Sequence, residues 1–165
     1  VPHKQQLQAV LGVCFVILSV AIFSLLSTMR VPVRLDGGRM PTRGSEHSAG
    51  YDIFSSDDAV VPAWSRLLTG TGVSIEIPRG FYGRLAPRSG LACKGIDVAA
   101  GVIDSDFRGE IKVLLVNNTA VDYVLKKDDR ISQLIFEQIG NPVLEESDAL
   151  SETERGYGGF GSTGK

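Results

Sequence analysis

The chain has 165 residues with 19 acidic and 17 basic side chains, and a formal net charge of −2, which suits one domain of ordinary size. That charge excludes the basic field that recruits nucleic acid, so we expect no direct nucleic-acid binding. The two cysteines, Cys14 and Cys93, lack metal-ligand spacing and lie in very different surroundings, so we expect no disulfide and a reducing compartment.

An uncharged apolar run, AVLGVCFVILSVAIFSLLSTM, occupies residues 9–29. A helix of that length can span a bilayer, and the arginines after it would then leave the C-terminal domain in the cytoplasm. Two other interpretations stay open. In the first, the run is a signal peptide, although no clean small-residue cleavage site follows it. In the second, Met29 is the true start and the residues before it are a non-native extension. We therefore separate residues 1–29, the only part for which we expect membrane contact, from a cytoplasmic or nuclear catalytic domain.

From Val31 onward, short β-branched or aromatic segments alternate with Gly, Pro, Asn and Asp, a pattern typical of strands and turns. The segments are VPVRL, YDIFS, AVVPAW, GVSIEI, YGRLA, KVLLVNN, YVLKK and RISQLIFEQI. No window shows the apolar stripe of a longer helix, and we expect one or two helical turns at 89–94 with Ser89 as the cap. The pattern predicts an all-β domain over residues 30–143, as a sandwich, jelly roll or small barrel.

Residues 144–165 differ in composition from this domain. LEESDALSETE is acidic and weakly apolar, which predicts a linker. RGYGGFGSTGK is too rich in glycine to form a core. It matches the start of a phosphate-binding P-loop, but that motif requires a strand before it and a Ser or Thr after the Lys, so we interpret the match as coincidence.

Polar side chains interrupt the strand pattern in three places: Asp52, Arg88-Ser89-Gly90, and Arg130 with Gln133. A guanidinium, a hydroxyl and free backbone N–H groups at a helix start suit an anion such as phosphate. Each feature is also common in turns and edge strands, so none of them alone defines a site.

The stretch GVIDSDFRG, residues 101–109, lies between the apolar flanks VAAGVI and IKVLLV. These flanks predict a hairpin with its turn near residues 105–108. In an extended backbone Asp104 and Asp106 point to opposite faces, so only one can face a given pocket. Asp104 directly follows Val102-Ile103, which we expect to be buried, and is the favoured general base.

In this order, and together with the glycine-rich tail, these segments resemble the five motifs of the trimeric dUTP pyrophosphatases (dUTPases). The matching stretches are AGYDIFS, APRSGLA, GVIDSDFRGE, DRISQLIFEQ and RGYGGFGSTG, within roughly residues 31–165. The resemblance implies a distorted, β-clip-like jelly roll with a flexible C-terminal arm, in a homotrimer whose active sites are each assembled from three subunits. It also implies Mg²⁺-assisted hydrolysis of dUTP to dUMP and pyrophosphate, which limits uracil incorporation into DNA and supplies dUMP for dTMP synthesis.

The resemblance implies a role for each matching residue. Asp104 would deprotonate the water that attacks the α-phosphorus and hold the sugar 3′-hydroxyl, and Arg155 would be the second catalytic residue. The backbone around Gly101 would contact uracil, the Phe107 ring would pack under deoxyribose, and Asp52 would act on the metal through water. Further substrate contacts are implied for Arg88, Ser89, Gly90, Gln133, Phe160, Gly161, Ser162 and Thr163, with Arg155 and the last four from a neighbouring subunit.

Three features depart from the family pattern. The loop ACKGIDVAAG is one residue shorter than in common members. Asp128 stands where Gly is usual, which predicts strain at a positive φ. Phe107 replaces the usual Tyr and keeps the ring but not the hydroxyl.

Two other functions stay open. A dCTP deaminase would share the fold, but it would require a Glu base near the hairpin and a second Ser at the position of Gly90. A catalytically idle, membrane-tethered nucleotide-binding trimer would not require the intact set of Asp52, Asp104, Arg155 and Phe160.

Overall fold

The computed structural model describes residues 29–159 of the chain. This part consists of antiparallel strands and one short helix, α2 (Ser89–Ala92). The strands are β1 (Val33–Leu35), β2 (Thr42–Arg43), β3 (Tyr51–Phe54), β4 (Ala59–Val61), β5 (Arg66–Thr69), β6 (Val73–Ile75), β7 (Phe81–Ala86), β8 (Ile96–Ala99), β9 (Val102–Ile103), β10 (Val113–Asn117), β11 (Tyr123–Leu125) and β12 (Arg130–Gln138). The all-β prediction is confirmed.

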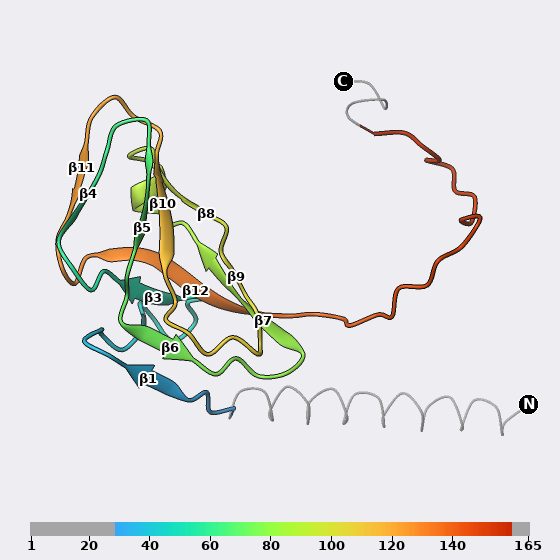
Figure 1. Ribbon diagram of the computed structural model, residues 1–165, viewed down its shortest axis with the longest axis horizontal. Coiled ribbons are helices and arrows are strands. Elements are labelled where there is room, and N and C mark those ends of the chain that lie inside the picture. The colour runs from blue at the N-terminus through green and yellow to red at the C-terminus, as the bar shows by residue number, and fades with distance from the viewer. Residues whose placement is uncertain (1–28, 160–165) are drawn as a thin grey trace, which may run out of the picture.

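The strands form a five-stranded sheet in the order β2-β3-β12-β7-β9 and a three-stranded sheet in the order β5-β10-β8. Two smaller pairs, β1-β6 and β11-β4, complete the body (Figure 1). Alternation along β10 shows how the core is made: Val113 and Leu115 are buried, whereas Leu114 and Val116 are only half-buried. Side chains of one parity thus fill the interior.

β12 holds the larger sheet together because it pairs with β3 on one side and β7 on the other. Ile131 and Leu134 of this strand are fully buried. A register shift between Arg130 and Ser132 marks a bulge at its start. Bulges re-aim side chains, and here the irregularity lies where two polar motifs of the sequence meet.

The hairpin predicted around residues 105–108 is wrong. β9 pairs with β7, whereas β10 pairs with β5 and β8, so the two apolar flanks belong to different sheets. Residues 100–112 leave the β8–β10 ladder, add β9 to the larger sheet and return, with the Ile111 N–H donating to the Val73 carbonyl. Sequence alternation cannot distinguish this excursion from a simple hairpin.

The helix at α2 is confirmed, but the predicted cap is wrong. Arg88 is the N-cap residue and its side chain makes no cap hydrogen bond, while Ser89 is already helical. The N–H groups of Leu91 and Ala92 donate to the Arg88 carbonyl, which sets the helix start one residue earlier. Asp128 has φ 68°, as its unusual position in the sequence predicts.

Beyond β12 the described chain runs away from the body as an extended arm (Figure 1). Val143 and Leu144 in this arm are 94% and 93% exposed. No helix between residues 29 and 159 is long and apolar enough to cross a membrane. The predicted apolar segment lies outside the described residues except for Met29, as do Phe160, Gly161, Ser162 and Thr163.

Candidate active site

Three strands of the larger sheet bring the polar interruptions of the sequence together. Asp52 of β3 lies opposite Gln133 of β12, and Gln133 lies opposite Ala86 at the end of β7. Residues in register across a sheet share a face. Pro87 and Arg88 follow Ala86 directly, so the Arg88 backbone lies next to the row formed by Asp52, Gln133 and Ala86.

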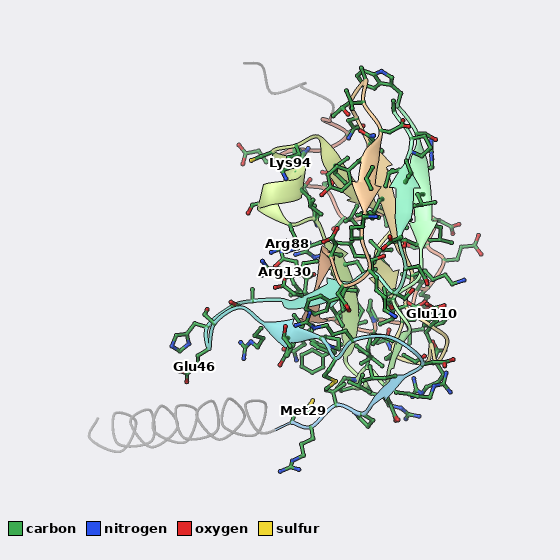
Figure 2. All side chains as sticks on the ribbon, turned by 90° about the vertical axis from the view of Figure 1, so that its left-hand side faces the viewer. Met29, Glu46, Arg88, Lys94, Glu110 and Arg130 are labelled. Carbon is green, nitrogen blue, oxygen red and sulfur yellow. The ribbon has the colours of Figure 1, made fainter. Side chains whose placement is uncertain are left out.

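The Asp52 carboxylate binds two arginines. Arg88 Nε donates to Asp52 Oδ1 at 3.0 Å, and an Nη of Arg130 donates to Asp52 Oδ2 at 3.3 Å. Figure 2 shows both arginines on the same side of the molecule, between α2 and the loop that joins β2 and β3. Neither motif alone predicts this contact, because Arg130 is 78 residues from Asp52 in the sequence.

The Gln133 amide is positioned by its surroundings. Its Nε2 donates to the Pro87 carbonyl at 3.0 Å. A Cβ at Gly50 would lie 2.8 Å from Gln133 Oε1, so the glycine leaves the space that the amide occupies. Ser89 and Gly90 lie exposed at the first turn of α2, where backbone N–H groups have no partner within the helix.

A second group of predicted residues follows β8. Gly101 has φ +91°, and a Cβ there would lie 2.7 Å from the Leu85 carbonyl oxygen, so a side chain is excluded. The Leu85 N–H donates to the Gly101 carbonyl at 2.8 Å. This hydrogen bond holds the start of the segment 100–112 against β7. The Phe107 ring is 42% exposed and lies against Gly109.

Asp104 does not follow a buried pair. Val102 is 65% exposed and Ile103 is half-buried. After Ile103 the backbone turns, and the Phe107 N–H donates to the Asp104 carbonyl at 3.2 Å. The backbone is therefore not extended at Asp104, and both Asp104 and Asp106 are exposed.

Within a single chain, Asp104 lies apart from Arg88 along β7. Ile103, next to Asp104, pairs with Gly83, which precedes Arg88 by five residues. At the strand rise this corresponds to roughly 15 Å. The described chain thus brings Asp52, Arg88, Ser89, Gly90 and Gln133 together, while Asp104 and Phe107 lie farther along β7. Gly101 lies between them, because it bonds to Leu85, the neighbour of Ala86.

Another carboxylate lies on the same sheet, but its environment makes it a poor base. The Tyr82 hydroxyl donates to Glu137, and Arg84 Nε donates to the other carboxylate oxygen at 2.6 Å. These two contacts, the tyrosine first, hold the pKa of Glu137 below its usual range. Glu137 therefore binds a proton less readily than an ordinary Glu.

Arg155 belongs to neither group. Its Nε donates to the Gly158 carbonyl at 2.8 Å, within the arm. Of the predicted arm residues it is the one that the structure describes, and the arm lies away from the body of its own chain (Figure 1).

Comparison with known proteins defines the class. A family model described as dUTPase matches residues 36–164. The deoxyuridine 5′-triphosphate nucleotidohydrolase of Paramecium bursaria Chlorella virus 1 is 56% identical, over 84% of this chain and 99% of its own length. The chain therefore belongs to the dUTPase family.

Solved structures agree. The dUTPase of Staphylococcus bacteriophage 80alpha with dUpNHpp superposes with a TM-score of 0.79 at 29% identity, over 84% of this chain and 100% of its own. A mutant dUTPase from phage phi11 of S. aureus, described with a structural Mg(II) ion, gives a TM-score of 0.70 at 25% identity, over 75% of this chain and 100% of its own.

Proposed function

We propose that this protein hydrolyses dUTP to dUMP and pyrophosphate. The observation that carries the proposal is the family match over residues 36–164, which contains all five motifs. The Arg88–Asp52–Arg130 cluster supports it, because paired guanidinium groups suit a polyphosphate.

The active site is shared between subunits of a homotrimer. The separation of Asp104 from Arg88 within one chain supports this proposal, since a nucleotide must contact both groups at once. The arm supports it too: Arg155 extends away from its own body and is available to a neighbouring subunit (Figure 1). One site then takes Asp104 from one subunit, Arg88 from a second and Arg155 from a third.

In the proposed reaction, water attacks the α-phosphorus while its proton passes to the Asp104 carboxylate. The bond from the α-phosphorus to the oxygen that bridges to the β-phosphate breaks, and pyrophosphate leaves with that oxygen. Arg88, Gln133, Arg155 and the N–H groups of Ser89 and Gly90 hold the phosphates. Catalysis of this kind consists mainly of positioning and charge neutralisation.

Mg²⁺ is the proposed cofactor, and the donor set limits how it is held. Among residues 29–159 no group of three or more His, Cys, Asp or Glu side chains is arranged to bind a metal. Both Asp52 oxygens already accept hydrogen bonds from arginine. This fits an ion carried mainly by substrate phosphates, with water between it and Asp52, as is usual for Mg²⁺. When bound, the ion neutralises phosphate charge.

The nucleoside end is bound by the other group. The backbone around Gly101 contacts uracil, and Phe160 of the arm stacks on the base. The Phe107 ring packs under deoxyribose and leaves no room for a 2′-hydroxyl. The exposed ring of Phe107 supports this role, because an aromatic face open to solvent is available for a ligand.

Phe107→Ala should lower the ratio of kcat/KM for dUTP to that for UTP by about tenfold or more, because a steric barrier to one hydroxyl is removed. Steady-state kinetics with both nucleotides measures it. Trp64→Ala, which removes another exposed aromatic ring from the turn between β4 and β5, is the control and should keep the ratio. An unchanged ratio in Phe107→Ala would mean that another residue recognises the sugar.

The activity itself is tested with the purified protein, Mg²⁺ and four nucleotides: dUTP, dCTP, dTTP and UTP. We expect pyrophosphate from dUTP alone. Ammonia from dCTP would instead identify a deaminase of this fold, and binding of dUTP without turnover would identify an idle binding protein.

A further inference from the structure

One more arginine lies beside the Asp52 cluster. Arg39 belongs to the segment between β1 and β2, and its guanidinium carbon lies 4.2 Å from the centre of the Phe54 ring. Phe54 is buried, whereas Arg39 is exposed. Within residues 29–159 the Arg39 side chain makes no hydrogen bond or ion pair, so the ring is what positions it.

Phe54 places Arg39 on the face that carries Asp52. Phe54 and Asp52 are two positions apart in β3, so their side chains project from the same side of the sheet. They lie roughly 7 Å apart along the strand. Arg130 lies opposite Phe54 in β12 and reaches Asp52 from there. Arg39 therefore lies over a ring whose strand neighbours include Asp52 and, across the sheet, Arg130.

This arrangement leaves positive charge uncompensated. Asp52 is the carboxylate that contacts Arg88 and Arg130 within the described chain, and Arg39 beside them pairs with no carboxylate there. A guanidinium held by a ring rather than by a carboxylate keeps its N–H groups available to another acceptor. The three arginines thus offer more cationic donors than one carboxylate can accept, and Arg39 and Arg130 are exposed.

We propose that Arg39 is an additional phosphate-binding residue of this enzyme, and that it contacts the terminal phosphate of dUTP and the pyrophosphate product. The inference rests on the proposed function and assigns a residue outside the five motifs to it. Arg39 lies over the ring of Phe54, two positions along β3 from Asp52, so it adds a cation beside the Arg88–Asp52–Arg130 cluster. It therefore favours ligands with more than one phosphate.

The test compares Arg39→Gln with Arg34→Gln. Arg34 is also exposed, and its guanidinium donates to Ser74 Oγ at 3.2 Å on β6, so this variant removes the same charge elsewhere. The inhibition constants of inorganic pyrophosphate and of deoxyuridine are measured at low ionic strength. For Arg39→Gln we expect a rise of about tenfold for pyrophosphate, the effect of one lost charged contact, a rise in KM for dUTP, and no change for deoxyuridine. Arg34→Gln should match the wild type.

A charge series separates binding from packing. Arg39→Lys should raise the pyrophosphate constant least, Arg39→Gln more and Arg39→Glu most, while the melting temperature does not follow that order. Equal pyrophosphate constants in Arg39→Gln and Arg34→Gln would overturn the proposal and leave Arg39 as a cover for Phe54. If the wild type failed to hydrolyse dUTP, the proposed function would fall, and calorimetric binding of pyrophosphate by the same variants would still test Arg39.

Discussion

Asp104→Asn should lower kcat by about 100-fold or more, the typical effect of removing a positioned general base, and leave the fold intact. Its side chain is exposed and makes no hydrogen bond or ion pair within residues 29–159, so the amide costs no native contact. Pyrophosphate release measures turnover, and calorimetry with dUpNHpp measures binding, which should change little.

Asp106→Asn is the matched control, because Asp106 is exposed in the same turn. It should keep kcat within about twofold. Near-normal turnover in Asp104→Asn, or an equal loss in both variants, would remove Asp104 from the role of base.

Deletion of residues 154–165 should abolish most turnover, with kcat/KM reduced by about 100-fold or more, since it removes a cation and an aromatic ring from each site. Stability should hardly change, because the described arm buries almost nothing: Leu150 is 89% exposed and Arg155 bonds within the arm. Ordering ten residues costs roughly 10 kcal/mol of backbone entropy, so contacts with the bound triphosphate must compensate.

Thermal unfolding, sedimentation and kinetics of the truncated protein test this expectation together. Arg155→Gln in the full chain is the intermediate control and should lose part of the activity. A truncated enzyme that kept most of its kcat would exclude the arm from the site.

Much of the fold follows from local pattern. The eight segments predicted as strands all contain strands. β-Branched residues between Gly, Pro and Asp prefer the extended conformation, and this preference can be recognised in a short stretch of sequence. β2 and β9, with two residues each, are too short for any periodicity. β5 and β8 carry Arg66, Thr69 and Asp97, which dilute the apolar pattern.

Pairing was the part that sequence could not supply. The hairpin predicted near residue 106 is wrong because β9 pairs with β7. No local sequence pattern predicts that pairing. The contacts of Asp52 with Arg88 and Arg130 could not be predicted for the same reason. The sequence motifs predict phosphate binding at Arg88, but only the register of β3, β12 and β7 brings both arginines to one carboxylate.

We propose that each active site is shared between subunits, and mixing of two inactive variants tests this. Asp104→Asn and Arg88→Gln are each expected to be nearly inactive. Co-expressed with different affinity tags, they form hybrid trimers that two successive purifications isolate. In a shared site, Asp104 from an Arg88→Gln subunit meets Arg88 from an Asp104→Asn subunit. Each purified hybrid then has one intact site in three, so activity should be restored to about a third of the wild type. Hybrids as inactive as both parents would show instead that each site lies within one chain.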